Sequence, residues 1–595
     1  MSVEADVQAT FCATLVDEWL RAGITDAVVC PGSRSTPLAL ALAARGELRL
    51  HVRLDERGAG FFAVGLGLAT GRPAVVLTTS GTAAAELHPA VVEAHHARVP
   101  LLACTADRPP ELQGVGAPQT IEQVGLFGPA VRWAAAPGVP VAATRGTWRS
   151  LAARSVGEAV AGPSGPGPVH LNLAFREPLV GPAGPLPGHR PGGGPVHRVS
   201  GPSAAGMPVD GSLVGHWPGR RGLVVAGAGC GPPAQVLALA EQLGWPVLAD
   251  PRSGCRLDHP NVVAAADAFL RSEPVREALR PEVVLVLGGP WASKVLAGFL
   301  AEAAGRGAEV VAVDPWWRWT DPDRLVDLVV RADPDGWLAG VLAELADRPA
   351  VAEAPPGWLD RWRGAESAAQ AAIDRVLTED AEGRRGGLTE PGVARLLLGT
   401  VPVGTLVVVS SSMPVRDLEW YARPLGEPPV VLANRGANGI DGVSATAQGV
   451  AAAGEGPVVG VLGDLAFLHD ASSLVQAVPA GAPAATGCTL LVLDNGGGGI
   501  FNFLPQATAL ADDRFEQLFG TPQAPDPAAV ARGFGLPVTE VSTGAALVQA
   551  LGALVGHPGL TVIRARLPGR VENVALHDRL HQAVSSDTEK LLFRA

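Results

Sequence analysis

The stretches GDLAFLHD at residues 463–470 and LVLDNGGGGIF at residues 491–501 decide how the C-terminal third of this chain folds. They adjoin two apolar runs, VVGVLGD at 458–464 and TLLVLDN at 489–495. Uninterrupted apolar runs of this kind are typical of parallel strands that helices cover on both faces. Because ligands bind beyond the carboxyl ends of such strands, we expect Asp464 and Asn495 to meet at a binding edge.

A carboxylate, an amide oxygen and a glycine-rich turn suit a hard cation such as Mg²⁺, which shares its remaining positions with phosphate oxygens and water. Asp464 and Asn495 supply the first two, and the glycines that begin at Gly496 supply the turn. The spacing resembles the GDG…N diphosphate-binding signature of thiamine diphosphate (ThDP) enzymes. Leu465 replaces the final glycine of GDG.

Composition narrows the class of protein. The 595 residues include 47% hydrophobic residues and carry a formal net charge of −12, which argues against broad nucleic-acid binding. The N-terminal residues show no secretory signal, and no apolar run is long enough to span a membrane. The six cysteines are scattered, so neither a disulfide framework nor a structural zinc site is predicted. A cytoplasmic location is the expectation.

Strand and helix patterns alternate in three blocks, which predicts an α/β fold of three Rossmann-like, doubly wound parallel-sheet domains in series. The predicted domains are residues 1–185, 212–348 and 386–595. A Gly/Pro-rich linker over 186–211 separates the first two. Residues 349–385 are predicted as a second linker with a bridging amphipathic helix.

A candidate catalytic carboxylate stands in the first block. The segment LRLHVRLDERGAGFF, from Leu48, predicts a strand that ends at Asp55 and Glu56, followed by a helix. In a ThDP enzyme, a glutamate in this place can hydrogen-bond the aminopyrimidine ring and promote the imino tautomer that activates the cofactor. Alternatively, Glu56 is a solvated charge at the start of a helix.

Longer motifs narrow the resemblance to one family. CPGSRSTPLA at 30–39, LLACTADRPPELQGVGAPQTI from Leu101, NRGANGIDG at 434–442 and NGGGGIFNFLP at 495–505 stand in collinear order. Together they resemble the 2-succinyl-5-enolpyruvyl-6-hydroxy-3-cyclohexene-1-carboxylate (SEPHCHC) synthases of menaquinone biosynthesis, which are ThDP-dependent transferases. The resemblance makes the first block the pyrimidine-binding domain and the third block the diphosphate- and Mg²⁺-binding domain.

The resemblance implies decarboxylation of 2-oxoglutarate on ThDP and 1,4-addition of the resulting carbanion to isochorismate. Both substrates are dianions, and the planar fork of arginine binds carboxylates in a bidentate manner. The implied substrate-binding residues are Ser33, Arg34, Arg108, Gln119, Lys294, Ser412, Arg416, Arg435, Ile500, Phe501 and Leu504. Taken singly, each arginine could instead be a surface charge, Lys294 a surface lysine, and the apolar residues core packing.

By the same resemblance, Glu56 is catalytic, and Glu56, Ser412, Ile440, Gly463, Asp464, Leu465 and Asn495 bind the cofactor. Mg²⁺, for which Mn²⁺ can substitute, would be held by Asp464, Asn495 and the carbonyl oxygen of Gly497. Ile440 would bend the cofactor. The resemblance further implies a homodimer or a dimer of dimers, with Glu56 and Asp464 of one site coming from different chains.

Two other functions remain open at this stage. Another ThDP-dependent 2-oxoacid decarboxylase or carboligase, of the acetolactate synthase kind, would share the cofactor residues. A nucleotide-dependent oxidoreductase is suggested by LVVAGAGCG from Leu223, a glycine turn after a strand, with Asp250 ending the next strand.

Overall fold

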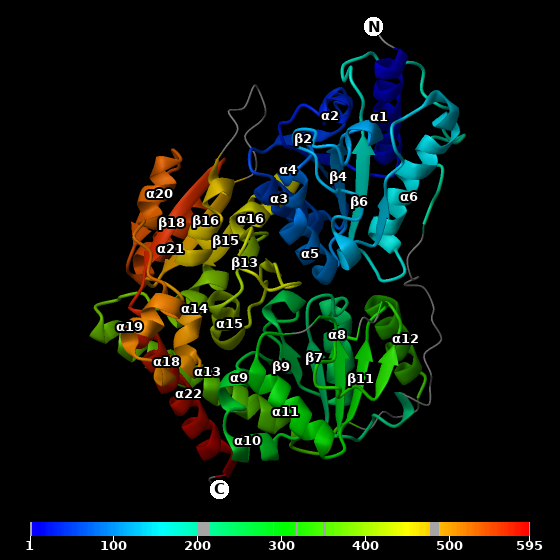
Figure 1. Cartoon of the computed structure of the whole chain (residues 1–595). Coiled ribbons are helices and arrows are strands. Elements are labelled where there is room, and N and C mark those ends of the chain that lie inside the picture. Colours follow the sequence, from blue (N-terminus) through cyan, green and yellow to red (C-terminus); the bar gives the residue numbers. More distant parts are fainter. Residues whose placement is uncertain are drawn as a thin grey trace.

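A computed structural model of the chain describes residues 3–199, 214–289, 291–316, 319–348, 353–475 and 487–593. Three parallel sheets of six strands each form its framework, which confirms the predicted fold class (Figure 1). Part of the predicted linker, residues 200–211, and residues 349–352 of the second linker lie outside the described residues.

The first sheet has the order β2-β1-β3-β4-β6-β5. Its strands are β1 (Asp26–Val29), β2 (Arg49–Val52), β3 (Ala74–Thr78), β4 (Leu101–Asp107), β5 (Trp133–Ala135) and β6 (Pro168–Ala174). Its helices are α1 (Val3–Arg21), α2 (Thr36–Ala43), α3 (Glu56–Thr70), α4 (Thr82–Ala85), α5 (His88–Ala97) and α6 (Trp148–Ala161). The core on one face includes residues of α1, α2 and α6, and the core on the other includes residues of α3 and α5.

The central sheet has the order β12-β11-β10-β7-β8-β9. Its strands are β7 (Gly222–Ala226), β8 (Val247–Ala249), β9 (Val262–Val263), β10 (Val283–Leu287), β11 (Glu309–Val313) and β12 (Leu328–Val330). Its helices are α8 (Pro233–Leu243), α9 (Ala266–Phe269), α10 (Glu273–Ala278), α11 (Lys294–Gly305) and α12 (Pro334–Ala346). The long helix α13 (Trp358–Gly383) follows. Its buried Trp358 and Trp362 share one core with the central and third sheets.

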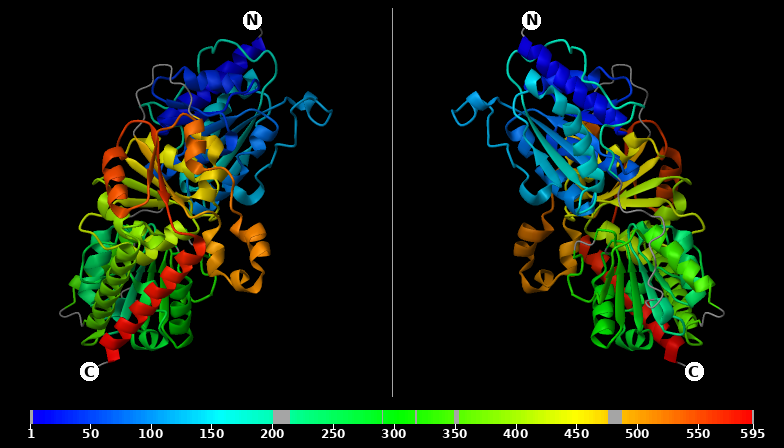
Figure 2. Two further views of the ribbon diagram at one scale, coloured as in Figure 1. Left: turned by 90° about the vertical axis from the view of Figure 1, so that its left-hand side faces the viewer. Right: turned by 90° about the vertical axis from the view of Figure 1, so that its right-hand side faces the viewer.

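The third sheet has the order β14-β13-β15-β16-β18-β17. Its strands are β13 (Leu406–Val409), β14 (Val430–Ala433), β15 (Val458–Gly463), β16 (Cys488–Asp494), β17 (Val538–Val541) and β18 (Leu560–Arg566). Its helices are α14 (Glu390–Thr400), α15 (Met413–Tyr421), α16 (Val443–Ala453), α17 (Asp464–His469), α18 (Gln506–Ala509), α19 (Asp512–Phe515), α20 (Pro527–Gly533), α21 (Gly544–Leu554) and α22 (Arg570–Phe593). In Figure 2 the central domain lies below the other two, and α22 runs down along it.

Helices α3 and α16 join the first domain to the third within one chain. They approach closely because both carry glycine at the contact. A Cβ atom on Gly65 would lie 2.2 Å from the carbonyl oxygen of Thr446, and one on Gly449 would lie 2.0 Å from that of Phe62. The glycines therefore set the distance between the two domains, and any larger side chain would push the helices apart.

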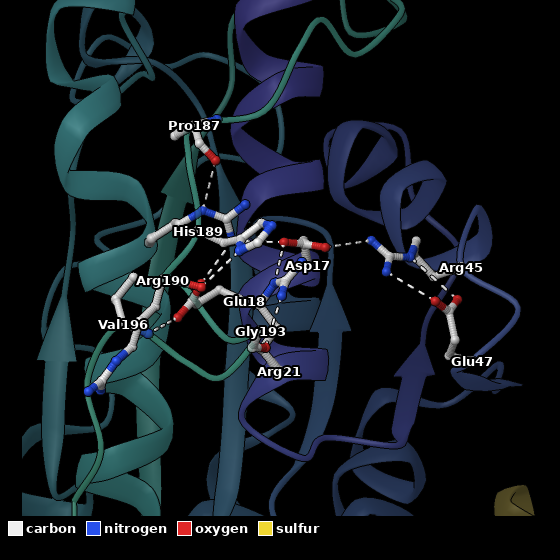
Figure 3. Close-up of polar contacts among 11 residues, drawn as sticks. Asp17, Glu18, Arg21, Arg45, Glu47, Pro187, His189, Arg190, Gly193 and Val196 are labelled. Carbon is white, nitrogen blue, oxygen red and sulfur yellow. Dashed lines mark hydrogen bonds and ion pairs between the residues drawn. The ribbon is translucent and has the colours of Figure 1, made fainter.

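A buried ion cluster fastens α1 to the chain that follows β6 (Figure 3). Arg149 donates to Asp17 and to Glu18, at 2.8 Å each, and to the carbonyl oxygen of Pro187 at 3.0 Å. Glu18 also accepts from the backbone N–H of Val196 at 2.5 Å. The described start of the predicted linker is thus held against the first domain by specific contacts, which its Gly/Pro-rich composition did not reveal.

All six cysteines are buried and none forms a disulfide in this structure. Among the described residues, no helix combines the length and the apolar character that crossing a membrane requires.

Candidate active site

Glu56 is the first residue of α3, and β2 ends at Val52, earlier than the predicted strand end at Asp55 and Glu56, because Asp55 caps the helix instead. Burial, together with the nearby carboxylates of Asp55 and Glu86, raises the pKa of the half-buried Glu56 carboxyl. Its neighbours bind the third domain, because Ser472 donates to Asp55 at 2.6 Å and Arg57 donates to the carbonyl oxygen of His469 at 2.8 Å. Glu56 therefore has a fixed helix-start position and a carboxyl that holds a proton more readily than an exposed glutamate does.

A polar group gathers at the carboxyl edge of the first sheet, around Ser80. Arg108 donates to Ser80 Oγ at 2.9 Å, and Gln119 donates to the Ser80 carbonyl oxygen at 3.0 Å. Arg34 is buried and bonds Phe175 O and Glu177 at 3.0 Å each, which leaves its Nε without a hydrogen-bond partner. Burial and the nearby Arg34 charge lower the pKa of Arg108, so the two arginines are close neighbours.

Ser33 is exposed on the same loop, just before Arg34. Gln119 has a φ of +56°, a left-handed conformation that a glutamine rarely adopts. We call Ser33, Arg34, Arg108 and Gln119 the first arginine group. The structure brings these four predicted residues to one edge.

The predicted metal ligands lie together at the carboxyl ends of β15 and β16. Asp464 is buried, and burial raises the pKa of its carboxyl to about 6, although hydrogen bonds from the backbone N–H groups of Leu465 and Gly497 oppose the shift. The strands pair in register up to Gly463 and Leu493. This pairing, and the bond to Gly497, place Asp464 beside the turn that carries Asn495 and Gly497.

The donor atoms fit a hard cation. Asn495 Oδ1 is a buried acceptor with no hydrogen-bond partner, whereas its Nδ2 donates to Glu390 at 2.7 Å. A buried oxygen of this kind carries a desolvation cost unless something binds it, and a cation beside Asp464 would do so. Among the described residues no group of three or more His, Cys, Asp or Glu side chains could hold a metal. The site therefore depends on the amide and carbonyl oxygens.

Glycine is required in the turn that follows Asn495. Gly497 has a φ of +134°, and a Cβ atom there would lie 2.2 Å from the carbonyl oxygen of Gly520. The turn is pressed against that segment, and Gly498 donates to the same carbonyl at 2.8 Å. This close backbone approach orients the Gly497 peptide unit next to Asp464.

A second arginine group, Ser412, Arg416 and Arg435, lies where α15 and β14 adjoin the central domain. Arg416 donates to the Ser412 carbonyl oxygen at 2.6 Å, and Ser412 has a φ of +71°. Burial, together with the charges of Arg252 and Arg416, lowers the pKa of Arg435 to about 10. The buried Arg435 Nε has no hydrogen-bond partner. Three neighbouring cations, Arg252, Arg416 and Arg435, are suited to a ligand with several negative charges, although Asp250 and Glu419 partly offset their charge.

Arg252 was not predicted from the sequence. It follows β8 and is held by Asp250. The Asp250 carboxylate accepts from Arg252 Nε at 3.0 Å and from Arg252 Nη2 at 2.9 Å. The sequence drew attention only to Asp250, as the residue that ends the second strand of a possible dinucleotide-binding pattern. The arginine two residues later lacked any motif of its own.

Lys294 is the exposed first residue of α11. The backbone N–H groups of Ala292 and Ser293 donate to Glu419 of α15 at 2.9 and 3.1 Å. These contacts hold the start of α11 against α15, the helix that carries Arg416, whereas no hydrogen bond or ion pair joins the Lys294 side chain to the second arginine group within the described residues.

The apolar residues assigned to the site are half-buried. Ile440 packs against the third domain's core on the α16 side, and Ile500 packs against the core on the opposite face. Phe501 lies against Phe519 with ring centroids 5.5 Å apart, and Leu504 ends the same short helical turn. Gly463 and Leu465 flank Asp464. Each of these half-buried residues therefore packs against the protein on one side and is accessible on the other.

Glu93 of α5 is another residue that the sequence did not single out. Its two carboxylate oxygens accept from the backbone N–H groups of Gly436 and Ala437, at 2.7 Å each. The first domain thereby holds the loop between β14 and α16, which carries Arg435 and Ile440. No short motif marks a contact between residues so far apart in the chain.

The geometry of the central sheet argues against the nucleotide-binding alternative. Gly289 donates to the Ala228 carbonyl oxygen at 2.7 Å, and a Cβ atom on Gly227 would lie 1.8 Å from the carbonyl oxygen of Gly289. The turns after β7 and β10 thus close the crevice in which a dinucleotide binds. The adjacent cavity, lined partly by Asp250 and Glu419, has a volume of about 30 Å³, which is too small for a dinucleotide.

Within the described part of one chain, no hydrogen bond or ion pair joins Glu56 to Asp464. The charges that act on Glu56 are Asp55 and Glu86, whereas those that act on Asp464 are Asp494 and Arg570. The two predicted halves of the cofactor site therefore belong to separate local environments.

Comparison with known proteins matches three family models in order along the chain. They are the N-terminal TPP binding domain of thiamine pyrophosphate enzymes at residues 10–126, the middle domain at 207–382 and the C-terminal TPP binding domain at 420–565. Thiamine pyrophosphate (TPP) is another name for ThDP.

Curated relatives are similar over nearly the whole chain. A protein of Chloroflexus aurantiacus is 41% identical over 98% of this chain and 98% of its own length. One of Bacillus velezensis is 38% identical over 98% of both, and one of Rubrobacter xylanophilus is 42% identical over 95% of this chain and 96% of its own. All three are named 2-succinyl-5-enolpyruvyl-6-hydroxy-3-cyclohexene-1-carboxylate synthase.

Proposed function

The chain belongs to the SEPHCHC synthase family of thiamine diphosphate enzymes, and we propose that it catalyses that family's reaction in menaquinone biosynthesis. It decarboxylates 2-oxoglutarate and adds the resulting succinyl unit to isochorismate, with release of CO₂ and retention of the enolpyruvyl group. The observation that carries the proposal is the pair of arginine groups at the carboxyl edges of the outer sheets. They suit dianionic substrates better than pyruvate, the substrate expected for an acetolactate synthase.

ThDP, when bound, supplies the carbon nucleophile and the electron sink for decarboxylation. We assign Asp464, Asn495 and the Gly497 carbonyl oxygen to Mg²⁺, with Mn²⁺ as a substitute, because they combine a buried carboxylate with an unpartnered amide oxygen. Glu56 is assigned to the pyrimidine ring. Its raised pKa suits a carboxyl that holds and releases a proton there.

The arginines bind and orient the two substrates. Arg34 and Arg435 each leave a buried Nε–H unpaired in the described structure, and a carboxylate would satisfy that donor. Half-buried Ile440, Ile500 and Phe501 line the same edge and would exclude water from the reacting carbon. Excluding water prevents protonation of that carbon before isochorismate is attacked.

We further propose that the active site is shared between two chains of a dimer or a dimer of dimers. The separate environments of Glu56 and Asp464 support this arrangement. Mixing inactive Glu56→Gln and Asp464→Ala variants, after dissociation and reassociation, should then restore part of the activity. If both residues served the same site from one chain, the mixture would stay inactive.

The test of the reaction is decarboxylation of 2-oxoglutarate with ThDP and Mg²⁺, with and without isochorismate, beside Glu56→Gln. Isochorismate-dependent adduct formation that collapses in the variant supports the proposal. Consumption of pyruvate, with 2-oxoglutarate untouched, would instead establish a ThDP enzyme of the acetolactate synthase kind. A protein that turns over neither substrate would refute the proposed activity.

A further inference from the structure

The amide group of Asn495 is held in one orientation by a buried glutamate. Asn495 Nδ2 donates to Glu390 Oε1 at 2.7 Å, while Asn495 Oδ1 has no partner and is buried. Reversing the amide would place its oxygen against the carboxylate oxygen of Glu390 and turn the NH₂ group to the side of Oδ1. An NH₂ group cannot bind a cation, so the two orientations differ completely in function.

Glu390 is itself held in place by burial and by contacts with neighbouring residues. It is the first residue of α14, is 3% exposed, and follows the N-cap residue Thr389, which accepts from the backbone N–H of Gly392 at 3.1 Å. Its carboxyl also lies within hydrogen-bonding reach of the buried carboxyl of Asp417 in α15. The glutamate therefore has little rotational freedom, and Asn495 meets a preformed acceptor.

The contact continues into the C-terminal helix. Asp417 accepts from His577 Nε2 at 2.8 Å, and the other ring nitrogen of His577 lies 2.8 Å from the Asn573 carbonyl oxygen. His577 and Asp417 are 0% and 1% exposed. A buried polar chain thus runs from α22 through α15 and α14 to the turn after β16, which lets three helices fix a single amide.

We propose that Glu390 is a positioning residue that fixes the side chain of Asn495 with its oxygen available to Mg²⁺. This assignment rests on the proposed metal site of the preceding section. It extends that site to a residue that touches neither metal nor substrate. Outer partners that orient metal ligands in this way strongly affect metal affinity.

The test compares Glu390→Met with Glu390→Gln, and the probe is Mn²⁺ titrated into protein saturated with ThDP, with free Mn²⁺ followed by electron paramagnetic resonance. Methionine keeps the volume but offers Asn495 no carboxylate. Glutamine can accept from Asn495 through its oxygen and donate to Asp417 through its NH₂. The Mn²⁺ dissociation constant should rise about 10- to 100-fold in Glu390→Met and less than about threefold in Glu390→Gln.

Two controls separate positioning from general damage. Exposed Glu427 provides the matched change Glu427→Met, which should leave Mn²⁺ affinity unaltered. In an Asn495→Ala background, adding Glu390→Met should weaken Mn²⁺ binding no further, because the residue acts through Asn495.

Unchanged Mn²⁺ affinity in folded Glu390→Met protein would overturn the assignment. If Glu390→Met does not fold, the Glu390→Gln variant alone tests the assignment. Glutamine keeps an acceptor oxygen for Asn495, so a loss of Mn²⁺ affinity of about tenfold or more in this variant would contradict the assignment. Wild-type protein that binds no Mn²⁺ with ThDP present would overturn the metal site itself. Since no turnover is measured, a wrong substrate assignment does not affect the result.

Discussion

The first and third sheets share one strand order, whereas the central sheet has another. Counted from the first strand of each sheet, the outer two run 2-1-3-4-6-5 and the central one runs 6-5-4-1-2-3, the order of dinucleotide-binding domains. The outer sheets nevertheless carry the candidate chemistry, and the central crevice is closed by contact between Gly227 and Gly289. Strand order alone therefore does not indicate function, which depends on the residues at the carboxyl edge.

The outer sheets also differ from each other. The edge of the first carries Glu56 and the first arginine group, which are suited to proton transfer and carboxylate binding. The edge of the third carries Asp464 and Asn495, which are suited to a cation, as well as the second arginine group. One topology thus presents complementary halves of the proposed site, and removing either half should have a distinguishable effect.

The largest expected effects come from two single substitutions, one in each half of the proposed site. Asp464→Ala should abolish Mg²⁺-dependent ThDP binding and with it all turnover, because the buried carboxylate is the only charged ligand of the assigned set. Glu56→Gln should retain ThDP binding but lose about 10²- to 10⁴-fold in kcat, the range for a proton-transfer group. Calorimetric ThDP titration beside steady-state kinetics distinguishes the two, and equal loss of ThDP binding in both variants would contradict the division of labour.

Replacing Arg149, which belongs to the buried ion cluster at α1, tests whether the first domain can lose stability without a change in substrate binding. Arg149→Ala leaves Asp17 and the fully buried Glu18 without their shared cation, and the free energy of unfolding should fall by about 3–5 kcal/mol. The control Arg363→Ala removes an exposed surface pair with Asp360 and should change it by less than about 0.5 kcal/mol. Denaturant unfolding measures both. Altered substrate affinity in Arg149→Ala would show that the cluster is coupled to the site.

The two arginine groups can be compared through Arg34→Ala and Arg435→Ala. Each removes a charge-assisted contact worth about 1.5–3 kcal/mol, so kcat/KM should fall about 10- to 100-fold. If the groups serve different substrates, one variant should weaken the binding of isochorismate and the other the binding of 2-oxoglutarate, each measured as a raised Michaelis constant. Weakened binding of both substrates in both variants would instead indicate a single shared pocket.

Stability should depend on pH through a buried histidine of the first domain, at a strand pair where the third domain has only threonines. His170 on β6 bonds Thr105 on β4, whereas the equivalent strands of the third domain pair Thr561 with Thr489. Burial lowers the pKa of His170 from 6.5 to about 4. The unfolded state therefore takes up the proton first, and His170 should make stability decline as pH falls from about 6.5 to 4, by up to about 1.4 kcal/mol per pH unit.

The matching measurement is denaturant unfolding of wild type and His170→Gln at pH 7, 6 and 5. Between pH 6 and pH 5, the wild type should lose about 1 kcal/mol of unfolding free energy relative to His170→Gln. Parallel curves would mean that His170 is as easily protonated in the folded state as in the unfolded state.

The smallest expected effect concerns the central sheet. NAD, FAD or ATP at millimolar concentration should leave the thermal midpoint unchanged, because the crevice between β7 and β10 is closed. ThDP with Mg²⁺, at about 100 times its dissociation constant, should stabilise the protein by about 2.7 kcal/mol. A nucleotide-dependent rise in the midpoint would restore the central domain as a binding domain.

Strand prediction failed selectively. The strand patterns of the three sequence blocks predict every strand except β5, β9, β12 and β17, each of which lies at a sheet edge and has two to four residues. An edge strand has only one neighbour and needs no continuous apolar run, so the pattern that revealed VVGVLGD and TLLVLDN is missing from it. Buried central strands were evident because both of their faces must be apolar.

Some residues around the candidate site could not be recognised from the sequence either. Asp464, Asn495, Glu56 and the arginines that follow strands were identifiable because they stand in short motifs beside those strands. Glu93, Arg252 and Glu390 were missed because each acts on a loop or side chain remote in sequence, such as Glu390 on Asn495. A hydrogen bond between such distant residues leaves no local pattern in a single chain.

The sequence by itself determined the three α/β units, their parallel sheets and the residue types offered at the outer edges, because apolar runs and the residues that end them are local properties. Only the tertiary structure decided that the central crevice is closed, that Arg252 joins Arg416 and Arg435, and that Glu390 orients Asn495. These features depend on how separate strands and helices approach one another. That approach is set by packing across the whole chain, by glycines such as Gly65 and Gly449 that let helices touch, and by buried polar groups that must find partners.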